Sequence, residues 1–252
     1  MNKLLKNIAK KALKLPLINN FLRSLDNQFE RDHFIEVEIE KLNKGSSILD
    51  AGCGSQRYRK LCEHLDYFSQ DFAQYESEGA NSFGLKGVSG LSGVYEYGQI
   101  DFIGDIWEID VDNESFDSVL CTEVFEHIPY PINTIKEFAR ILRSGGVLIL
   151  TVPSNSLRHM DPYFFYTGFS NRWFEKILDD YGFENIEITP VGDYFSWMSV
   201  ELFRTMRFKG WLAKLLCIPA FLYYYNVASS EESINALCMG YHVRATKKKS
   251  AN

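Results

Sequence analysis

Short apolar runs alternate with segments of helical periodicity along most of this chain, and this alternation is the feature that most constrains its fold. The succession of strand, helix and strand is typical of βαβ units, whose strands lie parallel beneath covering helices. We therefore predict a doubly wound α/β fold with a mostly parallel, seven-stranded sheet. The predicted strands cover residues 47–50, 67–71, 100–103, 116–121, 147–152, 183–189 and 237–245.

The chain divides into an N-terminal part and one larger domain. Apolar residues recur at helical spacing among the lysines of residues 4–15, and a second helical pattern covers residues 20–41. We predict a helical cap over residues 1–45 and a domain over residues 46–252, with a helical insertion at about 194–225. Residues 76–98 contain six glycines, which predicts a loop that follows the second strand and closes over the site.

Charge is distributed unevenly. The formal net charge is -6, yet the 25 residues before Asp26 hold six basic residues and no acid, which leaves 21 basic against 33 acidic residues in the rest. Nucleic-acid binding depends on basic residues that neutralise phosphates. The acidic body of the chain therefore argues against a nucleic-acid partner.

Two features bear on where the protein works. The five cysteines are scattered without a C-x-x-C pair, so we expect a reduced, cytoplasmic protein without structural zinc. Lysines interrupt the apolar residues of segment 1–25, which argues against a cleaved secretory signal. Segment 1–25 is a candidate cationic amphipathic helix and segment 211–225 a candidate apolar helix. Both either rest on an anionic membrane surface or a lipid-linked substrate, or cap the core.

The sharpest local motif is Ile48-Leu49-Asp50-Ala51-Gly52-Cys53-Gly54-Ser55. An apolar strand leads into two glycines and then into a predicted helical segment, so a ligand can lie against backbone N–H groups at a helix N-terminus. Arg57 stands where the dinucleotide fingerprint requires its third glycine. This departure argues against NAD or FAD.

Two acids follow the next strands. Asp71 ends the second apolar run and Asp105 follows the third, so both are expected at the carboxyl edge of the sheet. A carboxylate there accepts hydrogen bonds from ribose hydroxyls. Ile106 and Trp107 offer an apolar surface for a purine. The motif and these acids together predict a ligand that contains a nucleoside.

These motifs, with the runs Phe116–Ile128 and Leu142–Leu150, resemble those of the class I S-adenosylmethionine-dependent methyltransferases over residues 47–190. The resemblance implies a Rossmann-like sheet with S-adenosylmethionine at its carboxyl edge. By position, Gly52 and Gly54 face the methionine part, with Asp50 beside them, and Asp71 holds the ribose hydroxyls. Asp105 and Ile106 flank adenine, and Thr122 and Glu123 border the methionine amino group.

The acceptor is expected in the loop after the fifth strand. His127 and His159 are the candidate bases for a hydroxyl acceptor, and Arg158, Tyr163 and Tyr166 suit a polar ring or an acidic sugar. We predict O- or N-methylation of a small molecule, sugar or glycan precursor, without a catalytic metal because the five histidines are dispersed. The alternatives are a nucleotide-sugar or NAD-dependent enzyme on the same sheet, and a catalytically silent S-adenosylmethionine-binding module.

Overall fold

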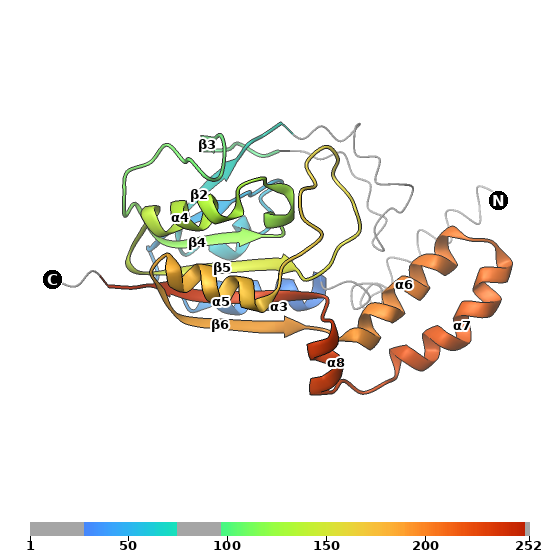
Figure 1. Cartoon of the computed structure of the whole chain (residues 1–252). Coiled ribbons are helices and arrows are strands. Elements are labelled where there is room, and N and C mark those ends of the chain that lie inside the picture. The colour runs from blue at the N-terminus through green and yellow to red at the C-terminus, as the bar shows by residue number, and fades with distance from the viewer. Residues whose placement is uncertain (1–27, 75–96, 250–252) are drawn as a thin grey trace.

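The computed structural model describes residues 28–74 and 97–249, and its centre is a twisted β-sheet (Figure 1). The order in the sheet is β3-β2-β1-β4-β5-β7-β6, in which β7 is antiparallel to both of its neighbours and the other pairs are parallel. The predicted doubly wound, mostly parallel sheet is confirmed. The strands are β1 (Ser47–Ala51), β2 (Asp66–Asp71), β3 (Phe102–Ile103), β4 (Phe116–Thr122), β5 (Leu142–Pro153), β6 (Phe183–Val191) and β7 (Gly240–Lys247).

Helices cover both faces of the sheet. One face carries α4 (Pro131–Ile141) and α5 (Asn171–Asp180), and the opposite face carries α3 (Gln28–Glu40) (Figure 1). Phe138 of α4 and Phe174 of α5 are fully buried in one apolar cluster, whereas Ile35 and Ile39 of α3 are buried in a second. The two clusters form the two layers of core that a doubly wound sheet requires.

Local sequence accounts for where several helices begin. Pro131 occupies the first turn of α4, where its missing N–H costs nothing. The Ser170 hydroxyl accepts the N–H of Trp173 at the start of α5. Gly182, which follows α5, has a φ of +83° that L residues rarely adopt. These residues fix where α4 begins and where α5 begins and ends.

Helices α6 (Tyr194–Phe208) and α7 (Trp211–Tyr225) match the predicted insertion and form a hairpin that projects from the domain (Figure 1). The short helix α8 (Glu231–Ala236), which the sequence did not predict, returns the chain to β7. Within residues 28–74 and 97–249, no helix combines the length and apolarity that a membrane span requires.

The structure differs from the sequence predictions after Gly54 and at the start of β5. The helix predicted after Gly54 is wrong, since turns and a short 3-10 helix, η1 (Arg59–Cys62), occupy that segment. Strand β5 begins at Leu142, before the predicted residue 147, although Gly145 has a φ of +82°. Segment 1–25 and most of the predicted loop at 76–98 lie outside the described residues. The domain boundary at residue 45 stays a prediction.

Candidate active site

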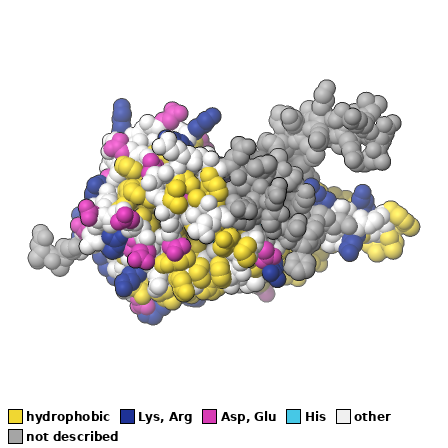
Figure 2. All heavy atoms as spheres, turned by 90° about the horizontal axis from the view of Figure 1, so that it is seen from above, with side chains coloured by type: hydrophobic (Ala, Val, Ile, Leu, Met, Phe, Trp, Pro, Cys, Tyr) yellow, Lys and Arg dark blue, Asp and Glu magenta, His cyan; other side chains and the backbone are white. Residues whose placement is uncertain are grey.

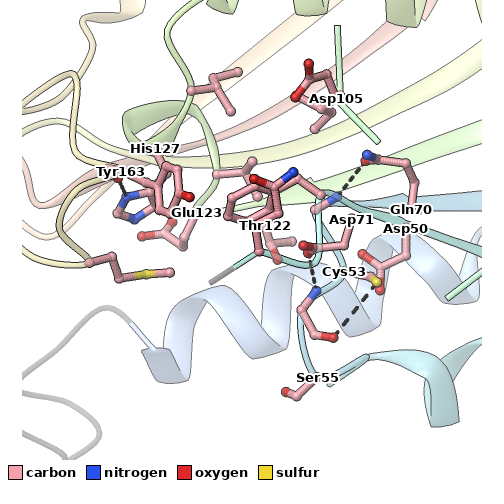
Figure 3. A pocket seen from close by; sticks show the side chains of 18 of the residues that line it. Asp50, Cys53, Ser55, Gln70, Asp71, Asp105, Thr122, Glu123, His127 and Tyr163 are labelled. Carbon is pink, nitrogen blue, oxygen red and sulfur yellow. Dashed lines mark hydrogen bonds between the residues drawn. The ribbon is translucent and has the colours of Figure 1, made fainter. Parts of the chain in front are cut away.

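A cavity of about 440 Å³ opens at the carboxyl ends of β1, β2 and β4 (Figure 3). Its volume falls within the range of about 300 to 1,000 Å³ that is common for small-molecule sites. The lining combines acids and aromatic rings from the sheet edge with residues of the loop after β5. The lining includes Arg31, Asp50, Gly52, Cys53, Gly54, Gln70, Asp71, Asp105, Ile106, Trp107, Thr122, Glu123, His127, Ile128, Met160, Tyr163 and Phe165.

Gly52 needs to be glycine for two reasons. Its φ is +73°, and a Cβ at this position would lie 2.5 Å from Cγ2 of Val124. The N–H groups of Gly52 and Cys53 donate to the carbonyl of Gln70, at 2.9 and 3.0 Å. The expectation that N–H groups here face a ligand is therefore wrong for these two residues, because they anchor the loop to β2.

Asp71 holds the other end of this loop. Its Oδ2 accepts the Gly54 N–H at 2.9 Å, and its Oδ1 accepts the Ala73 N–H at 3.0 Å. Burial raises the pKa of Asp71, and these N–H groups oppose the rise. Carboxylate oxygens have further lone pairs, so Asp71 can hold the loop and also accept from a ligand hydroxyl in the cavity (Figure 3).

Asp50 lies beneath the loop and is almost fully buried, with 2% of its surface exposed. The Tyr67 hydroxyl donates to Asp50 Oδ2 at 2.7 Å. Burial raises the pKa of Asp50 to about 7, an effect that the Tyr67 hydrogen bond opposes and the charge of Asp71 reinforces. Asp50 is thus part of the wall below the glycines, and its charge depends on pH near neutrality.

An apolar wall stands on the β3 side of the cavity. Asp105 is exposed at this end, Ile106 is buried, and Trp107 packs edge to face on Tyr130 with ring centroids 5.1 Å apart. The structure brings Asp105 and Ile106 to the same cavity as Asp71. A flat aromatic ring could stack or lie against such a wall.

Thr122 and Glu123 end β4 on the opposite side. Glu123 has a φ of +53°, and its N–H donates to the Thr151 carbonyl at 2.9 Å. Its Oε2 lies 3.4 Å from Nη1 of Arg31, which reaches the cavity from α3. Glu123 Oε1 and Arg31 Nε are both buried without a hydrogen-bond partner among the described residues. The cavity wall therefore contains an ion pair whose hydrogen bonds are incomplete on both partners.

The two candidate bases contact each other, although only His127 lines the cavity. The rings of His127 and His159 lie edge to face with centroids 4.6 Å apart. His127 Nδ1 is 2.6 Å from the Tyr163 carbonyl (Figure 3), and burial lowers the pKa of His127 to about 4. Burial and the charge of Glu123 raise the pKa of the adjacent Glu126. His127 is therefore neutral at pH 7, which a base requires, although a pKa this low makes it a weak one.

The proposed acceptor residues are only partly brought together. Tyr163 lines the cavity, whereas Arg158 and Tyr166 are not among its lining residues. Arg158 is exposed and pairs with Asp161 at 2.8 Å, and the Tyr166 hydroxyl donates to the Pro129 carbonyl at 3.3 Å.

Several lining residues were not singled out from the sequence. Arg31 comes from a helix assigned to the cap, and no local motif marks it as part of a site. Gln70 is buried, its side chain accepts from Gly52 and donates to the Gly104 carbonyl at 2.7 Å, and it directly precedes Asp71. A polar pair at the end of an apolar strand is the one signal that could have identified Gln70.

Fold and site together define the class that the sequence motifs resembled, the class I S-adenosylmethionine-dependent methyltransferases. The model of one family, described as a methyltransferase domain, matches residues 26–188. The chain therefore belongs to the methyltransferase domain family. The matched region includes α3 and thus Arg31.

Curated relatives include methyltransferases with different acceptors. The chain is 28% identical over 121 residues to a sterol 24-C-methyltransferase of Debaryomyces hansenii, a match that covers 46% of this chain and 30% of the relative. It is 27% identical over 121 residues to a malonyl-[acyl-carrier protein] O-methyltransferase of a Paenibacillus species, covering 45% and 42%. It is 30% identical over 111 residues to a ubiquinone biosynthesis O-methyltransferase of Xanthomonas oryzae pv. oryzae, covering 42% and 43%. The match spans less than half the length of each.

Solved structures share the fold at low sequence identity. The YcgJ protein from Bacillus subtilis is 15% identical, with 87% of this chain and 100% of that chain covered and a TM-score of 0.52. The cyclase SpnF is 16% identical, with 86% and 81% covered and a TM-score of 0.51. A cyclase among these neighbours illustrates that the fold alone does not define the reaction.

Proposed function

We propose that this chain transfers a methyl group from S-adenosylmethionine to an oxygen or nitrogen atom of a small molecule, a sugar or a glycan precursor. The observation that carries the proposal is the pair of unsatisfied polar atoms, Glu123 Oε1 and Arg31 Nε, buried in the same cavity as Asp71. The methionine end of S-adenosylmethionine bears an ammonium and a carboxylate. A carboxylate and a guanidinium that pair with each other but keep one oxygen and one nitrogen without a hydrogen bond are complementary to those two groups.

The remaining residues support the same orientation. Asp71 would hold the ribose hydroxyls, and Asp105 with Ile106 would flank adenine. When bound, S-adenosylmethionine supplies an electrophilic methyl group on a sulfonium. The protein forms no covalent bond in this transfer. Its role is to align the methyl donor with the acceptor and to exclude water. His127 and Tyr163 lie where the acceptor would enter, and the neutral His127 can take a proton from it.

Calorimetry with S-adenosylhomocysteine, NAD and a nucleotide sugar tests the proposal. We expect the full-length chain to bind S-adenosylhomocysteine and neither of the others. Asp71→Asn and Arg31→Gln should each weaken binding by about 1.5 to 3 kcal/mol, as for hydrogen bonds to charged groups. Asp66→Asn, which changes an exposed acid on the same strand, is the matched control and should bind normally. Binding of NAD instead, or unchanged affinity in both site variants, contradicts the proposal.

A separate observation favours a membrane contact. Helix α7 buries only Phe221, so the alternative that this segment caps the core is wrong for most of its length. Trp211, Leu215, Leu216 and Tyr223 are each more than 60% exposed. The projecting part of the hairpin carries these hydrophobic side chains together with basic ones (Figure 2).

We propose that α7 rests on an anionic membrane surface, where a lipid-linked acceptor would be presented. The helix contains no acid, and the exposed Lys209 and Lys214 flank its apolar surface. Trp and Tyr side chains favour the membrane interface, and each basic residue near an anionic surface contributes about 1 kcal/mol. The basic segment 1–25 would add to the same attraction.

A further inference from the structure

Three side chains that are potential metal ligands converge beside the cavity, whose lining includes His127 but neither Glu126 nor His159. Glu126 and His127 belong to the short 3-10 helix η3 (Phe125–His127) after β4, and His159 comes from the loop after β5. One ligand atom from each residue lies within 4.8 Å of the other two. The histidines are dispersed in the sequence, but two of the five meet in space. The dispersion of the histidines along the sequence therefore does not argue against a metal site.

Backbone hydrogen bonds fix the two segments against each other. The N–H groups of Phe165 and Tyr166 donate to the carbonyl of Glu126 at 2.9 and 3.2 Å. The loop that carries His159 is thus attached directly to η3. His159, which is half-buried, thus belongs to a loop whose backbone is held against η3.

In both His127 and His159, Nδ1 is hydrogen-bonded to a backbone carbonyl. His127 Nδ1 lies 2.6 Å from the Tyr163 carbonyl, and His159 Nδ1 lies 2.8 Å from the Leu157 carbonyl. A carbonyl oxygen can only accept, so Nδ1 carries the proton in each ring and Nε2 presents a lone pair. A backbone carbonyl on the second ring nitrogen is the usual support of a metal-binding histidine.

The carboxyl group of Glu126 is buried, and one of its oxygens has no hydrogen bond from the described residues. Only 1% of the residue is exposed, its Oε2 has no hydrogen-bond partner among the described residues, and its Oε1 lies 3.6 Å from His127 Nε2. With its proton on Nδ1, His127 has none to donate from Nε2. The nearby Arg31 pairs with Glu123. A buried carboxylate with one oxygen unpaired is costly, and a metal ion among these three groups would reduce that cost.

We propose that Glu126, His127 and His159 bind one divalent transition-metal ion. Two imidazole nitrogens with one carboxylate suit Zn²⁺, Mn²⁺ or Fe²⁺ better than Ca²⁺ or Mg²⁺, which prefer oxygen ligands. Three protein ligands leave coordination positions open. Because His127 and Tyr163 line the cavity, an ion held by His127 would lie beside the part of the cavity where we propose that the acceptor binds. An acceptor hydroxyl bound to the ion would lose its proton to water more readily, because the ion stabilises the alkoxide. With its Nε2 on the ion, His127 would be a ligand in place of the base.

Titration calorimetry on the full-length chain, stripped of metal with a chelator, tests the site with Mn²⁺ and Zn²⁺. We expect one ion per chain, and weakening by at least about tenfold in both Glu126→Gln and His159→Ala, since even residues behind the ligands matter by about 10- to 100-fold. His33→Ala is the matched control because His33 is exposed on α3, and it should bind normally. A visible spectrum of coordinated Co²⁺ that is lost in His159→Ala gives a second measurement.

Several results would overturn the site. These are the absence of binding by the unmodified chain, equal affinity in the two ligand variants, or an equal loss in His33→Ala. In the first case the two histidines serve as ring packing on Phe164, whose centroid is 5.4 Å from that of His159. Only the role toward the acceptor rests on the proposed methyl transfer. Metal binding is measured without S-adenosylhomocysteine, so each proposal can fail while the other stands.

Discussion

Asp50 should make the stability of this protein fall as the pH rises toward neutrality. The folded-state pKa of its carboxyl group is about 7, chiefly because of burial, against about 3.9 in an unfolded chain. The folded state therefore binds more protons than the unfolded state between these values. The favourable contribution is complete below about pH 4 and is lost as the pH rises through about 7. A shift of about 3 units corresponds to about 4 kcal/mol of unfolding free energy.

Asp50→Asn isolates this effect, because an amide oxygen can still accept the Tyr67 hydroxyl that Asp50 accepts at 2.7 Å. Urea unfolding of both proteins from about pH 4 to about pH 8 gives their difference in stability. Relative to the variant, the unmodified protein should lose about 4 kcal/mol over this range. Asp66→Asn, an exposed acid on β2, should show no such trend. A difference that stays within about 0.5 kcal/mol across the range would refute the reasoning.

Three further predictions concern the cavity and the hairpin. Gly52→Ala should destabilise the protein by at least about 1 to 2 kcal/mol because of its backbone conformation alone. Adding Val124→Ala should recover part of this loss, because it removes the side chain that a Cβ at residue 52 would approach to 2.5 Å. Melting temperatures of the single and double variants measure both effects. Trp107→Ala should weaken S-adenosylhomocysteine binding in calorimetry by about 1 to 3 kcal/mol if the ring stacks on adenine, and unchanged affinity would remove that role. The full-length chain should float with anionic vesicles at low salt, and a variant with Leu215 and Leu216 changed to serine should not. Self-association of the chain without flotation would instead assign the apolar surface to a second copy.

The two helices of the insertion were predictable from the sequence because turn-forming residues border them. Helices α6 and α7 begin and end at the predicted residues, because the surrounding Gly and Asp residues punctuate the pattern. The segment after Gly54 was not, since Gln56 at a φ of +55° turns the chain away from helix, and its sequence gives no sign of this. Helix α8 has six residues, too few for a periodic pattern to emerge.

The site was predictable where topology alone determines it. Asp71 and Thr122 each end a strand that lies parallel to β1 and beside it. Both therefore lie at the edge of the sheet where Gly52 and Gly54 follow β1. The contact between His127 and His159 depends instead on the path of a long loop. The position of Arg31 depends on how α3 packs across the sheet. Neither the loop path nor the packing of α3 leaves a local pattern in the sequence.

The hairpin of α6 and α7 is inserted between two strands that are neighbours in the sheet. The last residue of β6, Val191, pairs with the first residue of β7, Gly240, so the chain leaves and re-enters the domain at nearly one point. Lengthening such an excursion adds little closure entropy, because the cost grows only with the logarithm of its length. The hairpin is therefore a replaceable module: it can be exchanged, shortened to a tight turn or redirected to another surface while the catalytic half of the sheet keeps its register.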